Sequence, residues 1–183
     1  MSKIRLKTPL TTEVIELLNA GDEVLISGYI YTARDAAHMR LIALIDEHQP
    51  LPMALEGEVI YYVGPSPARP GEVIGACGPT TSYRMDSLTV PLLKLGLKGM
   101  IGKGDRSDDV IKAMQETKSV YFAAIGGAGA LISKSVISTE AIAFDDLGAE
   151  ALVKLEVVDM PAVVAIDCRG QNLYRNATLN FKK

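Results

Sequence analysis

Short blocks of clustered or alternating apolar residues run along the chain, and glycine, proline or charged residues separate them. Residues 22–33, DEVLISGYIYTA, are rich in β-branched and aromatic side chains and therefore predict a strand that contains Gly28. Residues 34–48 follow with the periodicity of a helix. One face of that predicted helix carries Ala37, Leu41, Ile42 and Ile45.

The same pattern predicts further elements on both sides of this pair. Helices are expected at TTEVIELLNA (11–20), in part of TTSYRMDSLTVPLLKLG (80–96), where Pro91 should break or kink the helix, and at SDDVIKAMQET (107–117), with Ser107 as N-cap. Strands are expected at EVIYYV (58–63), EVIGAC (72–77), KGMIG (98–102), SVYFAAIGG (119–127), LISKSVIS (131–138), ALVKLEVVD (151–159), AVVAID (162–167) and QNLYRN (171–176). Since strands and helices mix without strict alternation, we expect a layered α/β domain with a mixed sheet.

Composition narrows the class of protein. The length of 183 residues suits one domain, residues 1–183, and 48% of the residues are hydrophobic, enough for a sizeable core. The net charge of −3 argues against a general nucleic-acid binder. No run of 18 apolar residues predicts a membrane span, and the N-terminal segment lacks the apolar core of a signal peptide. We therefore expect a cytoplasmic protein.

Few residues of the types that bind transition metals are present. Cys77 and Cys168 lie far apart in the sequence, and His38 and His48 are the two histidines. Two cysteines do not supply the three or four thiolates that normally hold an iron–sulfur cluster. We therefore expect no autonomous metal site in this chain.

Three predicted junctions between a strand and a helix each carry a cation. In YTARDAAH, Thr32 and Asp35 have the form of a capping box, which would place Arg34 in the first helical turn. An arginine is electrostatically unfavoured there unless an anion is present. The alternative interpretation is a surface arginine paired with a nearby acid.

The second and third junctions follow EVIGAC and KGMIG. ACGPTTSYRMDS places three hydroxyl residues, beginning with Thr80 and Thr81, shortly before Arg84, and one hydroxyl would suffice for a helix cap. The alternative is an N-cap with surplus hydroxyls and a solvated arginine. KGMIGKGDRSDD places Lys103 between two glycines but does not match a Walker A loop, and GGAGAL (126–131) does not match GxGxxG and is interpreted as a close-packing turn.

If these three loops meet in space, their cations suit a small dicarboxylate. Arginine binds a carboxylate through two parallel hydrogen bonds, and lysine acts as a compact charge. A diphosphate has similar charge, but neither phosphate-loop pattern is present. The sequence alone does not bring the loops together, so their convergence is a hypothesis for the structure to address.

Several long segments resemble the β subunit, or C-terminal domain, of the class I, iron–sulfur-dependent fumarate hydratase family. They are GDEVLISGYIYTARDAAHMR, GPSPARPGEVIGACGPTTSYRMDS, KGMIGKGDRS and VKLEVVDMPAVVAIDCRGQNLY, in the family's order. The resemblance implies a swivelling β/β/α domain. It also implies a hetero-oligomer in which a partner α subunit carries a [4Fe–4S] cluster, so that this chain alone would be inactive.

The same resemblance implies a reaction and roles for residues. The reaction is the reversible hydration of fumarate to L-malate, with Arg34, Arg84 and Lys103 binding the substrate, Thr81 lining the site and Thr80 moving the C3 proton. A threonine hydroxyl is a poor base, so a neighbouring group must take or share that proton. Which group does so is left open.

This sequence differs from the family's usual residues at two positions, and two alternative functions remain open. Tyr83 stands where the family often has a small residue, and Asp105 stands where it often has Asn. Tyr83 would narrow the pocket, and Asp105 would weaken the contact of Lys103 with an anion. The alternatives are the β subunit of L-tartrate dehydratase and a non-catalytic dicarboxylate-binding module. His38 is interpreted as a packing residue or a proton shuttle.

Overall fold

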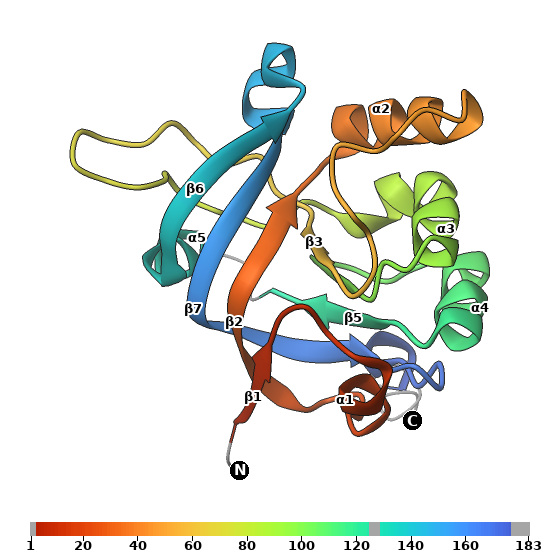
Figure 1. Ribbon diagram of the computed structural model, residues 1–183. Coiled ribbons are helices and arrows are strands. Elements are labelled where there is room, and N and C mark those ends of the chain that lie inside the picture. Colours follow the sequence, from red (N-terminus) through yellow and green to blue (C-terminus); the bar gives the residue numbers. More distant parts are fainter. Residues whose placement is uncertain (1–2, 125–128, 177–183) are drawn as a thin grey trace.

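The computed structural model describes residues 3–124 and 129–176, which build a mixed sheet with three of the helices stacked along one side (Figure 1). The strands are β1 (Ile4–Lys7), β2 (Glu23–Thr32), β3 (Val59–Tyr61), β4 (Gly99–Gly102), β5 (Val120–Ala123), β6 (Val136–Ala143) and β7 (Leu152–Ile166). The helices are α1 (Thr12–Glu16), α2 (Asp35–Asp46), α3 (Asp86–Lys94), α4 (Asp108–Thr117) and α5 (Gly129–Ile132), with 3-10 turns η1 (Ser82–Met85), η2 (Ser133–Ser135) and η3 (Asp145–Glu150).

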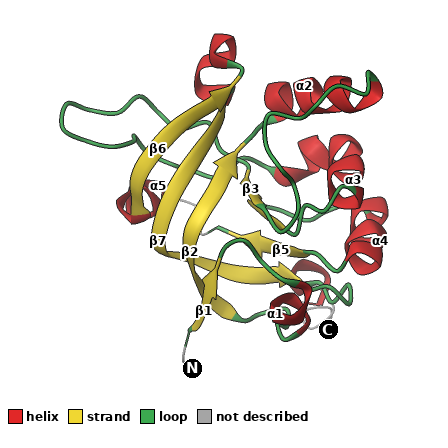
Figure 2. Ribbon diagram, in the orientation of Figure 1, coloured by secondary structure: helices red, strands yellow, loops and turns green. Residues whose placement is uncertain are grey.

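The sheet closes on itself. Strands β1 to β5 run parallel in the order β1-β2-β3-β4-β5, while β7 is antiparallel to β5, β6 and β2. Because the long, bent β7 pairs with both β5 and β2, strands β2, β3, β4, β5 and β7 form a closed ring (Figures 1 and 2). The prediction of an α/β protein with a mixed sheet is confirmed.

Each face of the sheet has its own apolar core. Successive residues of a strand point to opposite faces, and β3 shows the consequence. Tyr61 packs in the core that includes Ile30, Phe122 and Val164. Its neighbour Ile60 packs in the second core, which includes residues of α2, α3 and α4. This second core fixes the three helices, and with them the loops that connect them to the strands.

Local patterns predicted several elements well. The strand at 22–33 is β2, the helix at 34–48 is α2, and the helix at 107–117 is α4. Ser107 caps α4, because its Oγ accepts a hydrogen bond from the Val110 amide at 3.4 Å. The helix predicted at 11–20 forms as the shorter α1, and Thr11 is its N-cap.

Two predicted strands are wrong. Residues 72–77 are irregular and belong to a long loop that extends away from the sheet (Figure 1). In that loop, Gly75 lies against the backbone of Ser66, so close that a Cβ would meet the Ser66 carbonyl oxygen at 2.2 Å. Residues 173–176, expected in a strand, instead form one helical turn. Both segments make hydrogen bonds to residues that are distant in the sequence, and a local sequence pattern does not report such contacts.

Two other expectations need correction. The predicted strand at 131–138 starts as α5 and η2, and β6 begins at Val136. Pro91 does not break α3, which continues to Lys94. The carbonyl that would accept a bond from position 91 belongs to Ser87, which is exposed, so water can bond to it.

The glycine-rich turn at 126–131 lies partly outside the described residues, which resume at Gly129. There a Cβ would lie 3.0 Å from the Gly78 amide nitrogen, so Gly129 packs directly against backbone. Among the helices of residues 3–124 and 129–176, none combines the length and the apolar character that a membrane span requires.

Candidate functional site

The three cation-bearing loops start from neighbouring strands. Strands β2, β3 and β4 are parallel, and they end at nearly the same level: Thr32, the last residue of β2, pairs with Tyr61, the last of β3, which pairs with Ile101, the last but one of β4. Their carboxyl ends therefore share one edge of the sheet, where ligands of α/β proteins tend to bind. The loops that leave this edge lead to α2, η1 and α4.

Arg34 and Arg84 meet at a shared carboxylate. Arg84 Nε lies 3.0 Å from Asp35 Oδ1, and Arg34 Nη2 lies 3.8 Å from Asp35 Oδ2. Arg34 Nη2 also lies 3.4 Å from Glu150 Oε1, contributed by η3. The side chain of Arg34 is 23% exposed and that of Arg84 46%. The two arginines are thus brought together, although they lie 50 positions apart in the sequence.

Lys103 lies beside the two threonines. Thr81 and Lys103 form an isolated parallel bridge, the Ser82 amide donates to the Lys103 carbonyl at 2.9 Å, and the Lys103 amide donates to the Thr80 carbonyl at 3.3 Å. The Thr80 amide also donates to the Tyr62 carbonyl at 2.7 Å, which fixes this loop to the end of β3. Within the described ranges, neither threonine hydroxyl has a hydrogen-bond partner, and the Lys103 ammonium has no ion pair.

The capping box predicted at the start of α2 is wrong. Arg34 itself is the N-cap residue, and its side chain makes no capping bond. The Thr32 hydroxyl instead donates to the Ala151 carbonyl at 3.3 Å and accepts from the Val153 amide at 3.2 Å. Thr32 therefore belongs to the contact between β2 and β7. Asp35 does not form the predicted capping box and instead faces the two arginines.

His38 packs beneath this site. Its side chain is fully buried, its Nδ1–H donates to the Arg34 carbonyl at 2.9 Å, and its ring meets the Tyr62 ring edge-on at 5.3 Å. Burial lowers the pKa of His38 to about 4, although the bond to Arg34 opposes this. The ring is therefore neutral near pH 7, which supports the packing interpretation.

Asp105 binds residues other than Lys103. Its carboxylate accepts from Asn172 Nδ2 at 2.6 Å and from Arg175 Nε at 3.0 Å. Burial alone would raise the pKa of Asp105, but the hydrogen bonds from Asn172, the Arg106 amide and Arg175 outweigh it and lower that pKa. The carboxylate is thus ionised and paired with residues near the C-terminus.

The sequence interpretation missed Arg106. Its side chain is fully buried, and it donates to Asp86 Oδ1 at 2.6 Å, to Thr89 Oγ1 at 2.9 Å and to the Tyr62 hydroxyl at 3.2 Å. The Asp86 carboxylate also accepts from the Ser107 amide at 2.7 Å. This pair joins the segment that carries Arg84 to the segment that follows Lys103. Nothing in GDRSDD distinguishes a buried arginine from an exposed one.

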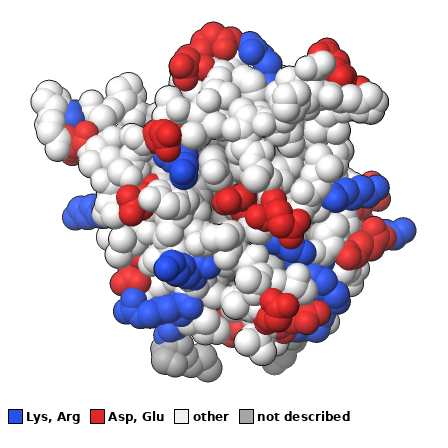
Figure 3. Space-filling view, viewed as in Figure 1, with Lys and Arg blue, Asp and Glu red and all other residues white. Residues whose placement is uncertain are grey.

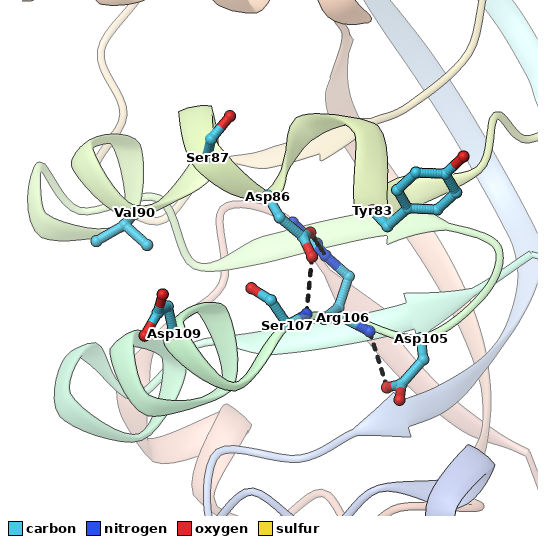
Figure 4. A pocket seen from close by; sticks show the side chains of 8 residues that line it. All are labelled: Tyr83, Asp86, Ser87, Val90, Asp105, Arg106, Ser107 and Asp109. Carbon is cyan, nitrogen blue, oxygen red and sulfur yellow. Dashed lines mark hydrogen bonds and ion pairs between the residues drawn. The ribbon is translucent and has the colours of Figure 1, made fainter.

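A hollow of the surface lies next to the Asp86–Arg106 pair. It measures about 780 Å³ and lies between α3 and α4 (Figure 4). The carboxylates of Asp86, Asp105 and Asp109 line it, and the one guanidinium in its wall is already paired with Asp86. None of the five predicted site residues lines it, and an acidic hollow repels a dicarboxylate.

The described residues do not fit an iron–sulfur cluster. Cys77 and Cys168 are both buried, and burial raises the pKa of the Cys77 thiol to about 11, whereas a cluster binds thiolates. Among residues 3–124 and 129–176, no group of three or more His, Cys, Asp or Glu side chains has the arrangement of a metal site. Arg34, Arg84 and Lys103 bring three cations to the strand ends, where Asp35 and Glu150 pair with the arginines, and acidic and basic groups intermix over the face in Figure 3.

The fold and this cluster define an α/β protein with a cationic site at the ends of parallel strands. Comparison with known proteins gives the family. Residues 1–177 match the model described as Fumarase C-terminus, and the chain belongs to that family.

Three relatives show how the chain relates to longer proteins. It is 35% identical to Fumarate hydratase 2 of Leishmania major over 177 residues, which cover 94% of this chain and 31% of that protein. It is 35% identical to "Fumarate hydratase class I, anaerobic" of Escherichia coli, covering 94% and 32%. It is 36% identical to the "Putative L(+)-tartrate dehydratase subunit beta" of Methanocaldococcus jannaschii, covering 90% and 88%. The chain thus spans about a third of these fumarate hydratases and most of the third relative.

Proposed function

We propose that this chain is the β subunit of a two-subunit hydro-lyase that reversibly hydrates fumarate to L-malate. The observation that carries the proposal is the convergence of Arg34 and Arg84 on one carboxylate, with Thr80 and Thr81 on the loop that leads to Arg84 and Lys103 on the neighbouring loop after β4. Three cations at one sheet edge match the two carboxylates of the substrate. The family and its fumarate hydratase members support the reaction.

In this proposal the chain supplies binding and proton-handling groups. Arg34, Arg84 and Lys103 bind the substrate carboxylates, Thr81 lines the site, and Thr80 is the catalytic residue that handles the C3 proton. Since the described residues give the Thr80 hydroxyl no hydrogen-bond partner, the group that shares its proton comes from substrate, water or a partner subunit.

The cofactor and the partner follow from the same resemblance. A partner α subunit carries the [4Fe–4S] cluster, the two chains form a hetero-oligomer, and this chain is inactive alone. The size of the Methanocaldococcus jannaschii relative, of which the chain covers 88%, supports a separate small subunit. We further assign the closed ring and its helices to the swivelling β/β/α class, as one domain over residues 1–183, and the protein to the cytoplasm.

A second candidate is the β subunit of L-tartrate dehydratase. The Methanocaldococcus jannaschii relative, a putative L(+)-tartrate dehydratase subunit beta, favours it, because this chain matches nearly all of that protein. A tartrate carries the same two carboxylates as malate and one more hydroxyl, so the same cations would bind it. Assays of the reconstituted pair on fumarate, L-malate and both tartrates distinguish the two reactions.

The proposed function is tested by removing one arginine at a time. We expect Arg84→Ala and Arg34→Ala each to lower kcat/KM of the anaerobically reconstituted pair roughly thirtyfold to several thousandfold. This range corresponds to a loss of about 2–5 kcal/mol of transition-state stabilisation. The matched control is Arg40→Ala, because Arg40 lies on α2 but pairs with the exposed Asp146 at 2.6 Å. Wild-type activity in either arginine variant would refute the role of that residue, and an inactive wild-type pair on all four substrates would refute the function.

A further inference from the structure

Asp35 lies between the two arginines of the proposed function and has no role assigned so far. One carboxylate oxygen faces each guanidinium, at 3.0 Å for Arg84 and 3.8 Å for Arg34. Asp35 is the first residue of α2, a helix of 12 residues, whose N-terminus favours a negative charge. The carboxylate is thus held by its own helix and by both arginines.

The contact with Arg84 uses one edge of the guanidinium. It involves Nε, and within the described ranges it is the one ion pair that Arg84 makes. The opposite edge, formed by the two Nη groups, is therefore free to bind a ligand carboxylate through two parallel bonds. A side chain that is nearly half exposed would otherwise sample many rotamers, so the Asp35 contact restricts the direction of this edge.

Arg34 is held more loosely and keeps unused donors. Its distances to Asp35 and Glu150, 3.8 Å and 3.4 Å, are longer than ordinary charge-assisted hydrogen bonds. Arg34 Nε and Asp35 Oδ2 are both buried and lack a hydrogen-bond partner in the structure. Buried polar atoms are normally paired, so Arg34 Nε keeps a donor that a ligand carboxylate would satisfy, whereas the acceptor Asp35 Oδ2 needs a donor such as water.

We propose that Asp35 is a positioning residue that holds Arg84 beside Arg34 before the dicarboxylate binds. This inference rests on the proposed function, because it assigns Asp35 a role at the same site. Asp35 acts through the arginines: it neutralises part of their mutual repulsion and directs the free edge of Arg84 toward the substrate. The substrate carboxylate then meets an arranged pair of guanidinium groups rather than two mobile ones.

Removing the charge of Asp35 has two opposed effects, and their balance sets the expected sign. An uncharged residue no longer repels the substrate. However, Arg84 then loses its ion-pair partner among the described residues, whereas Arg34 keeps Glu150. Ordering a long, free side chain on binding reduces affinity by roughly tenfold. The repulsion is already screened, because two guanidinium groups neutralise Asp35 in the free protein. We therefore expect weaker binding.

The test compares Asp35→Asn with Asp146→Asn in the chain reconstituted with its α subunit. Asp146 also pairs with an arginine, at 2.6 Å, and that pair is exposed on the surface. The readouts are the dissociation constant of succinate, a saturated dicarboxylate that cannot be hydrated, and KM and kcat for the substrate. We expect Asp35→Asn to raise the dissociation constant and KM about tenfold with kcat less affected, and Asp146→Asn to change each less than about twofold.

A double-mutant cycle separates positioning from a structural role. If Asp35 acts through Arg84, Asp35→Asn should weaken succinate binding less than about threefold when Arg84 is already alanine. Asp35→Glu, which keeps the charge, should recover part of the affinity, and thermal midpoints should stay within a few degrees of wild type.

The outcomes distinguish the positioning role of Asp35 from the proposed function. Equal effects of Asp35→Asn in the wild-type and Arg84→Ala backgrounds would overturn the positioning role while leaving the proposed function intact. An unchanged or tighter succinate affinity in Asp35→Asn would do the same. A pair that binds succinate but turns over none of the four substrates would refute the proposed function, and the succinate affinities would still decide the role of Asp35. A wild-type pair that binds no succinate would overturn both.

Discussion

The buried ion pair between Asp86 and Arg106 makes a quantitative prediction about stability. The two side chains meet at 2.6 Å, with the arginine side chain 0% exposed and the aspartate 12%. The guanidinium also lies 5.2 Å from the ring centres of Tyr62 and Tyr121. The substitution Asp86→Asn keeps the size of the side chain and removes the charge that neutralises Arg106.

The expected cost follows from burial. Leaving a buried charge without its partner costs about 3–5 kcal/mol. For a chain of this length, that corresponds to a fall of roughly 6–20 °C in Tm. The matched control is Asp146→Asn, since Asp146 and Arg40 meet at the same 2.6 Å distance but are 62% and 47% exposed. A surface pair contributes about 0–1 kcal/mol, so the two identical substitutions should differ by several kcal/mol.

Urea denaturation of the wild-type chain and of both variants measures this difference. The free energy of unfolding should fall strongly in Asp86→Asn and little in Asp146→Asn, with similar slopes against urea concentration. Equal losses in the two variants would show that burial of Arg106 does not decide the strength of the pair. A gain in stability in Asp86→Asn would mean that Arg106 reaches solvent or another partner.

Two further predictions use single residues beside the site. A Cβ on Gly64 would lie 3.0 Å from Arg34 Nη1 and 3.2 Å from the Ala149 carbonyl oxygen. Gly64→Ala should therefore displace Arg34 and raise the KM of the reconstituted two-subunit enzyme severalfold. The control is Gly78→Ala, which should leave KM unchanged because no atom lies within 4 Å of the added Cβ. A KM equal in both variants would refute this. Because the folded-state pKa of His38 is about 4 and the ordinary value is 6.5, the unfolded chain binds more protons between these values. The stability that neutral His38 contributes is therefore fully present above pH 6.5 and falls by about 1.4 kcal/mol per pH unit between pH 6.5 and about 4. Urea denaturation at several pH values should therefore show the free energy of unfolding falling more steeply with decreasing pH in the wild type than in His38→Gln. Equal pH dependences in the two proteins would contradict this prediction.

The amino-acid sequence alone predicted those features that depend on near neighbours along the chain. Apolar spacing predicted β2, α2 and α4, and a hydroxyl before an acidic turn predicted the N-cap at Ser107. These predictions succeed because the side-chain direction in a helix or strand repeats every few residues, and because the cap of a helix lies within one turn of its end. The same local patterns placed Arg34 and Lys103 after the strands that became β2 and β4, whereas the strand predicted before Arg84, residues 72–77, is irregular.

Tertiary structure alone decided which of these loops are neighbours and what their side chains meet. The parallel alignment of β2, β3 and β4 brings Arg34 and Arg84 to one carboxylate, and the β2–β7 pairing takes the Thr32 hydroxyl away from the helix it was expected to cap. Burial made Arg106 an internal ion-pair partner, although its local sequence is that of a surface turn. The physical reason is that apolar periodicity reports that a face is buried but carries no information about which distant segment covers it.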